Sequence, residues 1–300
     1  MVSSIEIILI PTLMIFLGYA LKRFDILKAQ DSTTLSKIVI NVSMPALIFT
    51  NLVTANISID MIILPITSII VSLICMTIAF LFCKSRGYSK IKTWTLMIAS
   101  AMMNTGFVGY PITLGVFGNE GLINAIFFDL STSIIFVVYG MVLVSQFGGD
   151  RKEVVKSGLS FMPLWAVIFG LIFNIGHIQY GYVLNSALTY LANSTVPLIM
   201  ISLGLTIDFK GIKDYLNDSL VVSAIRLVIA PVIVFVALSA LNVTGLIFKV
   251  AVLESGMSTA MTALVLSITY GLDNKLMSSC IFIDILLSLI SLTCVITVLT

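Results

Sequence analysis

The stretch Asn104-Thr-Gly-Phe-Val-Gly-Tyr-Pro111 lies in the middle of an apolar run, 93–117, that is long enough to cross a membrane. Proline lacks an N–H donor and its ring clashes with the carbonyl four residues earlier, while glycine weakens the helix around it. A regular helix is therefore not expected to continue through this stretch. Unwound backbone at membrane depth is tolerated only where it is buried in protein or lines a wet cavity, so the predicted break is a candidate site.

The composition of the chain indicates that water is not its main solvent. Of 300 residues, 59% are hydrophobic and 10% are charged, whereas a soluble domain carries roughly 25% charged residues. A spanning helix needs about 20 apolar residues, and ten runs of suitable length are present. They are 5–21, 36–54, 61–83, 93–117, 121–147, 158–176, 183–206, 217–241, 245–270 and 276–300. We expect an all-α membrane protein with ten transmembrane helices in a lipid bilayer.

Basic residues follow the odd-numbered runs and mark one side of the membrane. These five loops hold 14 of the 16 Lys and Arg residues. They are Lys22, Arg23, Lys28, Lys37, Lys84, Arg86, Lys90, Lys92, Arg151, Lys152, Lys156, Lys210, Lys213 and Lys275. Cytoplasmic loops are enriched in Lys and Arg, so we expect a multi-pass protein of the cell membrane with both termini outside. The net charge of +2, without a long basic run, does not indicate a nucleic-acid partner.

Four landmarks recur at a fixed separation of 152 residues, each in the equivalent run of the other half. The pairs are Pro11 with Pro163, Gly18 with Gly170, Asn41 with Asn193 and Pro45 with Pro197. Residues 1–150 and 151–300 are therefore expected to be repeats of five helices each. Because five is an odd number, the second repeat enters the membrane from the opposite side, and the repeats are inverted. Inverted repeats are typical of secondary transporters, which bind substrate near the midplane where broken helices meet.

The ninth run contains a second predicted break, Glu254-Ser-Gly-Met-Ser-Thr-Ala-Met-Thr262, rich in small and hydroxyl residues. Gly256 lies 152 residues after Asn104, so helices four and nine are expected to break at corresponding positions and to cross. Half-helix N-termini suit a carboxylate, and freed carbonyl groups suit a cation. We expect a small organic anion as substrate. The candidate binding residues are Asn104, Thr105, Gly106, Pro111, Gly256, Met257 and Ser258.

Other polar groups in the apolar runs each have two interpretations. Asp129 and Asp284 form either a support site for substrate or protons, or hydrogen-bonded carboxyl groups near a helix end. Arg226 either pairs with one of these acids or extends toward the cytoplasmic face, and we favour the second interpretation. The glycines and prolines of the two breaks could also serve only close packing and kinking.

Five stretches of the sequence match a known pattern. They are Asn41-Val-Ser-Met-Pro45-Ala-Leu, Asn104 to Pro111-Ile, Phe117-Gly118-Asn-Glu, Pro197-Leu through Ser202-Leu-Gly204, and Leu286-Leu-Ser-Leu-Ile. At these residues the sequence resembles the auxin efflux carrier family, which includes plant auxin exporters and prokaryotic permeases proposed for malate and similar acids. The resemblance covers nearly the whole chain. It implies scaffold helices, a moving transport domain whose crossed helices bind a carboxylate by alternating access, and a homodimer. The sequence departs from the family pattern at Ser258, where proline is common, and at Ser291-Leu-Thr293, where Thr-Leu-Pro is common.

The stretch Glu254-Ser-Gly-Met257 is also similar to a Glu-x-Gly-Met stretch of the distantly related bile-acid sodium symporters, where the acid helps to hold sodium. An acid at membrane depth is costly and usually functional. We therefore expect Glu254, with Asn104 and the neighbouring hydroxyls of Ser255 and Thr105, to couple transport to Na⁺ or H⁺. No other cofactor and no bound metal centre is expected.

Two rival functions use the same features. Paired membrane aspartates occur in intramembrane aspartyl proteases, but here Asp129 follows Phe128 and Asp284 follows Ile283, so the Gly-x-Gly-Asp motif of those enzymes is missing. No nucleotide-binding motif is present, and we do not expect an enzyme. An uncoupled uniporter or channel could use the same crossed helices, and only saturable flux with counterflow distinguishes a carrier from a channel.

Overall fold

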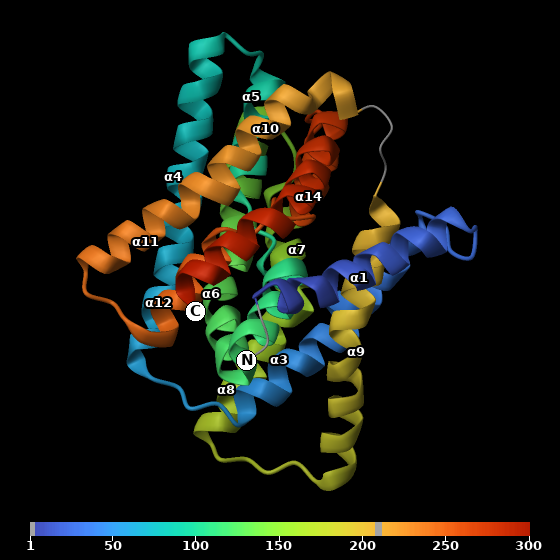
Figure 1. Ribbon diagram of the computed structural model, residues 1–300, viewed down its shortest axis with the longest axis vertical. Coiled ribbons are helices and arrows are strands. Elements are labelled where there is room, and N and C mark those ends of the chain that lie inside the picture. Colours follow the sequence, from blue (N-terminus) through green and yellow to red (C-terminus); the bar gives the residue numbers. More distant parts are fainter. Residues whose placement is uncertain (1–3, 208–211) are drawn as a thin grey trace. The chain divides into compact units, whose positions relative to one another are not determined.

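The computed structural model describes residues 4–207 and 212–300, and all regular structure within them is helical (Figure 1). Lys210, one of the predicted loop residues, lies outside the described residues. The chain forms two compact units, each of which draws on both halves of the sequence. Unit 1 comprises Met1–Ile59, Tyr110–Ile126 and Leu159–Asp208, and unit 2 comprises Asp60–Gly109, Phe127–Gly158 and Phe209–Thr300.

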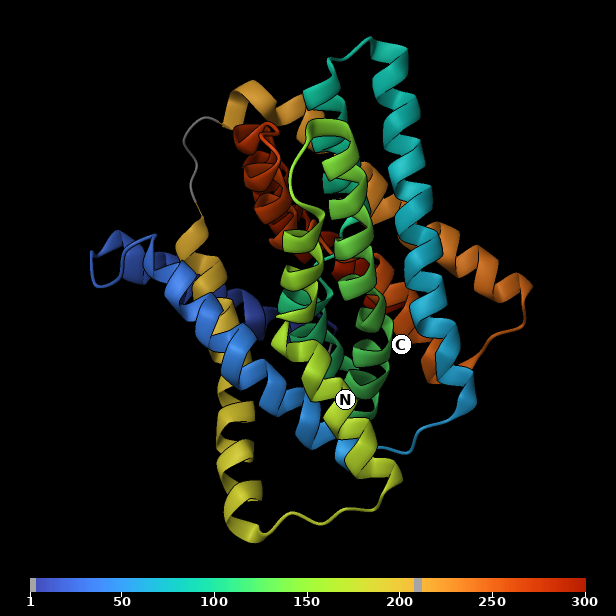
Figure 2. The same ribbon diagram turned by 180° about the vertical axis from the view of Figure 1, so that it is seen from behind.

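Unit 1 is built on close contacts between helix backbones. Its helices are α1 (Ser4–Arg23), α2 (Asp31–Ile38), α3 (Met44–Val53), the first part of α6 (Tyr110–Phe147), α8 (Met162–Ile175) and α9 (Tyr182–Thr206). α1 crosses α9 in both views (Figures 1 and 2). A Cβ on Gly18 would lie 2.3 Å from the carbonyl oxygen of Ile201, and one on Gly170 would lie 2.9 Å from Leu52 Cβ. Both landmark glycines therefore allow close helix packing.

Unit 2 contains the helices on which the predicted breaks occur. They are α4 (Ile63–Arg86), α5 (Lys90–Ala101), the later part of α6, most of α7 (Arg151–Leu159), α10 (Leu216–Ala224), α11 (Ala230–Ala240), α12 (Gly245–Ser255), α13 (Thr262–Thr269) and α14 (Asn274–Leu299). α4 and α5 form an antiparallel hairpin (Figure 1). Its turn is at Gly87, whose φ of 64° suits a residue without a side chain.

Three helices widen into a π-helical turn just before a proline. The turns are Val39–Ser43, Thr105–Gly109 and Ile225–Ile229, and Pro45, Pro111 and Pro231 follow each by two residues. Proline cannot donate to the helix ladder and crowds the carbonyl four residues earlier, so a wider turn relieves the clash. Pro197, the predicted repeat partner of Pro45, lies inside α9 without such a turn.

The described residues contain six helical segments long and apolar enough to cross a membrane, or seven if the bent pair α7 and α8 counts as one. One of these segments includes α6, which is interrupted at Gly118 (φ 65°, ψ −160°) between the fourth and fifth predicted runs. The prediction of a helical membrane protein is therefore confirmed. The count of ten helices and the inverted repeat of 1–150 and 151–300 stay predictions.

Candidate functional site

Helical structure is interrupted in unit 2 at both predicted positions, and the two interruptions pair with each other. α5 ends at Ala101 before the turn that begins at Thr105, and α12 ends at Ser255 before α13. The Asn104 N–H donates to the Ser258 carbonyl at 2.9 Å, and the Ala260 N–H donates to the Met102 carbonyl at 2.9 Å. These reciprocal bonds resemble those between antiparallel strands. We call residues 102–105 and 256–260 the crossing.

Two hydroxyl groups lie at the carbonyls that α5 leaves free at its end. The Ser72 hydroxyl donates to the Ala101 carbonyl at 2.8 Å, and the Thr259 hydroxyl lies 2.9 Å from the Ala99 carbonyl. Ser72 is in turn 2.7 Å from the Tyr139 hydroxyl. Buried carbonyl groups without a partner are costly, so hydroxyl groups at these positions stabilise the first break in the interior of unit 2.

A guanidinium group satisfies the carbonyls that α12 leaves free. Nη2 of Arg226 donates to the carbonyls of Ser255 at 2.8 Å and Met257 at 3.0 Å. The arginine is 0% exposed. The prediction that Arg226 extends toward the cytoplasmic face is therefore wrong, because the break supplies acceptors for the guanidinium within unit 2.

Each intramembrane aspartate holds a threonine of the crossing. The Thr105 hydroxyl donates to Asp129. Asp284 accepts from the Thr259 N–H at 3.1 Å and hydroxyl at 2.6 Å, and also from the Ser223 hydroxyl. The two threonines are 154 residues apart and the two aspartates 155 apart. Each acid therefore lies at nearly the same distance along the chain from its threonine, although neither pair matches the offset of 152. The hydrogen-bonded interpretation of these acids therefore describes their geometry, and a role toward substrate or protons stays a prediction.

Glu254 lies against the backbone of the first break. Its side chain is fully buried, and a Cβ added to Gly109 would lie 2.1 Å from Glu254 Oε2. The absence of a side chain at Gly109 therefore leaves room for the carboxyl group in this conformation. The Ser255 hydroxyl, predicted to accompany this acid, donates to the Val252 carbonyl at 2.7 Å, while the Thr105 hydroxyl donates to Asp129.

Two polar side chains at the crossing are buried without a hydrogen-bond partner in the described parts of the chain. They are the amide nitrogen of Asn104, a residue 3% exposed, and the hydroxyl of Ser258, a residue 0% exposed. Buried polar groups normally have a partner, so each orphan needs an explanation. An amide NH₂ offers two donors and a hydroxyl offers one, which suits a carboxylate ligand.

The remaining predicted site residues are distributed between the two units. Gly106 belongs to the π-helical turn, Gly256 ends α12 next to Pro231, and Met257 is fully buried. Pro111 is the second residue of α6 and is assigned to unit 1, whereas the crossing belongs to unit 2. The repeat landmarks also belong to unit 1: they are Asn41, Pro45, Asn193 and Pro197.

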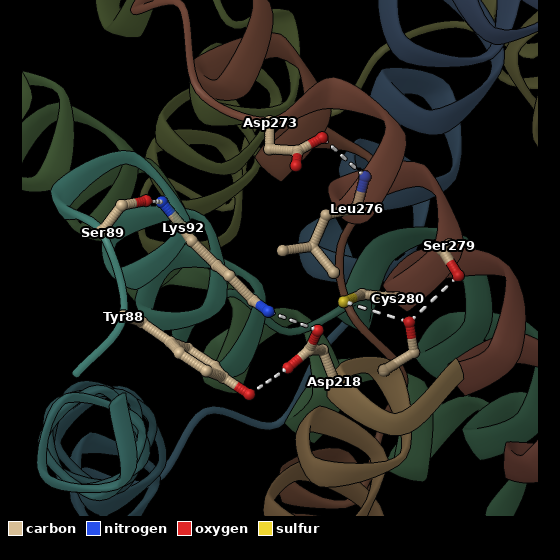
Figure 3. A network of polar contacts seen from close by, with 9 residues as sticks. Tyr88, Ser89, Lys92, Asp218, Asp273, Leu276, Ser279 and Cys280 are labelled. Carbon is tan, nitrogen blue, oxygen red and sulfur yellow. Dashed lines mark hydrogen bonds and ion pairs between the residues drawn. The ribbon is translucent and has the colours of Figure 1, made fainter. Parts of the chain in front are cut away.

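A polar network at one end of unit 2 was not predicted as a unit from the sequence (Figure 3). Asp218 of α10 accepts from Lys92 at 2.7 Å and from the Tyr88 hydroxyl at 2.7 Å, and so joins the α4–α5 turn to α10. This hydrogen bond to Asp218 raises the pKa of Tyr88 above its ordinary value. The sequence marks Lys92 only as a loop charge, because its partner is more than a hundred residues away.

These features define a polytopic helical membrane protein with a buried polar crossing. A family model described as membrane transport protein matches residues 3–161 and 152–296. The chain is 43% identical over 292 residues to an uncharacterized transporter of Methanothermobacter thermautotrophicus, covering 97% of this chain and 96% of the relative. It is 36% identical over 296 residues to an uncharacterized transporter of Methanocaldococcus jannaschii, covering 95% of both chains. The protein therefore belongs to the auxin efflux carrier-like family of membrane transport proteins.

Proposed function

We propose that the protein is a secondary-active transporter of small organic anions and that the substrate carboxylate binds at the crossing. The observation that carries this proposal is the pair of buried side chains, Asn104 and Ser258, whose donors have no partner in the described chain. Their residues are joined by the backbone bond from Asn104 to Ser258, so both belong to one small site. A carboxylate would satisfy both groups.

The charges around the crossing also favour an anion. The Arg226 guanidinium bonds the carbonyl of Met257, the residue before Ser258. A guanidinium keeps its charge at any physiological pH, and its field is strong where water is excluded. The helical turn that begins at Thr105 and the helix α13 start at the crossing, and helix N-termini carry partial positive charge. These groups together would offset the cost of burying a carboxylate.

The proposed mechanism is alternating access in two inverted repeats of five helices, with unit 2 carrying the substrate. Within unit 1, α1 packs on α9 while α8 packs on α3, which is the exchange of partners that a two-fold repeat produces. Within unit 2, the pairs Thr105 with Asp129 and Thr259 with Asp284 are equivalent in the same way. The proposal includes a cell-membrane location, both termini outside the cytoplasm, and a homodimer.

Coupling to a cation gradient, either Na⁺ or H⁺, is proposed to act through Glu254. A fully buried acid beside the first break is sensitive to whether a cation or a proton accompanies the substrate. Replacing Glu254 by Gln keeps the shape of the side chain and removes its charge.

The test is uptake of radiolabelled malate, succinate and indole-3-acetate into proteoliposomes, with Na⁺ and H⁺ gradients imposed separately. We expect saturable uptake of at least one acid, driven by one gradient, and loss of the gradient dependence in Glu254→Gln. We also expect Asn104→Leu to reduce uptake at least tenfold, while Asn124→Leu on α6 is the control. Flux that never saturates would indicate a channel, and saturable flux indifferent to both gradients would indicate a uniporter.

A further inference from the structure

The end of α12 at the crossing has the geometry of a cation site. The carbonyl oxygens of Ser255 and Met257 converge on one point, because the same atom, Arg226 Nη2, lies 2.8 Å from the first and 3.0 Å from the second. Carbonyl oxygens freed at a helix C-terminus carry partial negative charge and are ligands that hard cations accept. In this chain the positively charged guanidinium of Arg226 lies at that point.

We propose that Arg226 is a built-in cation that occupies the position where a coupling metal ion would otherwise bind, so that transport needs no sodium. The inference rests on the proposed function in placing transport at the crossing, and it narrows the coupling ion to the proton. A tethered guanidinium is always present at its site, whereas a free ion must bind from solution. Sodium would have to displace both hydrogen bonds to use these carbonyls.

The surroundings of Arg226 hold the guanidinium in place. Arg226 lies in the π-helical turn Ile225–Ile229, and Pro231 follows this turn. Pro231 packs on the break itself, since a Cβ on Gly256 would lie 3.3 Å from Pro231 Cγ. Nη1 of Arg226 lies 3.8 Å from the sulfur of Cys75 on α4. The position of the charge is therefore fixed by packing, as a bound ion would be fixed by its ligands.

Substitutions at Arg226 distinguish two roles of its guanidinium: a hydrogen-bond donor that only stabilises the break, or a charge that takes the place of a bound ion. Arg226→Ser removes the charge and opens space beside the two carbonyls, so that Na⁺ can bind them with water molecules as its other ligands. Arg226→Lys keeps a tethered cation at the same carbonyls. Arg226→Met fills much of the space without a charge or an oxygen, and so provides a control that cannot bind an ion.

The experiment measures thermal unfolding of the purified full-length protein in NaCl, KCl and choline chloride at equal ionic strength. We expect the wild type and Arg226→Lys to unfold at the same temperature in all three salts. We expect Arg226→Ser to be stabilised by Na⁺ alone, in a saturable way and by on the order of a few degrees, and Arg226→Met to show no Na⁺ response.

Two results would overturn the inference: a saturable Na⁺-specific stabilisation of the wild type, or a folded Arg226→Ser protein that responds equally to all three salts. Should Arg226→Ser not fold, ²²Na⁺ binding to the wild type decides alone, and saturable binding would reject the inference. No transported substrate enters these measurements. Failure of the sodium test therefore leaves anion transport standing, and absence of anion uptake leaves the sodium test standing.

Discussion

The two breaks of unit 2 share a hydrogen-bond frame but differ in charge. In each, a threonine at the crossing donates to an aspartate on a following helix: Thr105 to Asp129 in the first and Thr259 to Asp284 in the second. At the first break the neutral Ser72 hydroxyl donates to the freed carbonyl of Ala101, whereas at the second break the Arg226 guanidinium donates to two freed carbonyls. The comparison shows that two breaks with similar backbone geometry can differ in charge, since a positively charged side chain lies at the second break and a neutral one at the first.

The largest effect is expected from removing the space that Gly109 leaves for Glu254. In Gly109→Ala the new methyl would lie 2.1 Å from Oε2, so either the buried Glu254 carboxyl group or the break must shift, and overpacking of this kind costs about 1–3 kcal/mol. We expect anion uptake to fall at least tenfold in proteoliposomes. The control is Gly181→Ala, because a Cβ there meets nothing within 4 Å.

A double variant decides whether the clash acts through the acid. Adding Glu254→Ala to Gly109→Ala should restore most of the lost thermal stability without restoring uptake, because the two residues are in contact and their effects are not additive. Stability losses that simply add would show that Gly109 matters for another reason.

The two threonines provide a direct comparison of the breaks, with a smaller effect. The Thr259 hydroxyl contacts both Asp284 and the Ala99 carbonyl, so Thr259→Val should cost about 1–3 kcal/mol of unfolding free energy. We expect Thr105→Val, which removes the hydroxyl bonded to Asp129, to cost less. Denaturant unfolding measures the loss of unfolding free energy in both variants, and Thr259→Ser and Thr105→Ser, which keep the hydroxyl, are the controls. Equal losses in the two valine variants would contradict the larger role assigned to the Thr259 hydroxyl.

The proline after the first break should affect transport more than stability. In Pro111→Ala, the turn Thr105–Gly109 can tighten toward an α-helix, so we expect stability to stay level or rise by about 1 kcal/mol while uptake falls severalfold. Pro197→Ala is the matched control, since its helix α9 has no wide turn. Equal uptake by the two variants would mean that the π-helical turn has no part in transport.

The smallest effect is expected away from the crossing, in the network of Tyr88, Lys92 and Asp218. Tyr88→Phe should cost about 1 kcal/mol, because it removes a single part-buried hydrogen bond. The hydrogen bond to Asp218 raises the Tyr88 pKa, so its contribution is complete below the unfolded pKa of about 10 and is lost as pH rises through the folded pKa. The stability difference between wild type and Tyr88→Phe should therefore be present at pH 8 and disappear in strong alkali, and a difference that grows with pH would contradict this.

The sequence predicts the breaks because their causes are local. Glycine, proline and hydroxyl residues at Asn104–Pro111 and Glu254–Thr262 weaken a helix wherever it packs. A fixed offset also indicates that the two breaks are equivalent, although it cannot show that Met102 and Asn104 bond Ala260 and Ser258. The general membrane class follows from composition alone.

The partners of the buried charges could not be predicted, because they depend on distant elements. Arg226 finds its acceptors 29 and 31 residues further along the chain, and only the break at Ser255 makes those carbonyls free. A sequence pattern marks the arginine as unusual at that depth, and the general tendency of long basic side chains to extend toward water then favours the wrong direction. Gly109 was likewise visible only as a helix breaker, because Glu254 lies more than a hundred residues away.

Substrate protection of a cysteine at the crossing is the measurement that tests the central claim most directly. Ser258→Cys is placed in a background in which Cys75, Cys83, Cys280 and Cys294 are all replaced by alanine. It is labelled with a membrane-permeant maleimide in proteoliposomes, where the proposed alternating access would expose the buried crossing. Ser145→Cys, exposed near the end of α6, is the control. We predict that the acid giving saturable uptake slows labelling of Ser258→Cys, with half-protection near its half-saturating concentration, and leaves Ser145→Cys unchanged. A transport-active Ser258→Cys protein labelled equally fast with and without saturating acid would contradict a substrate site at the crossing.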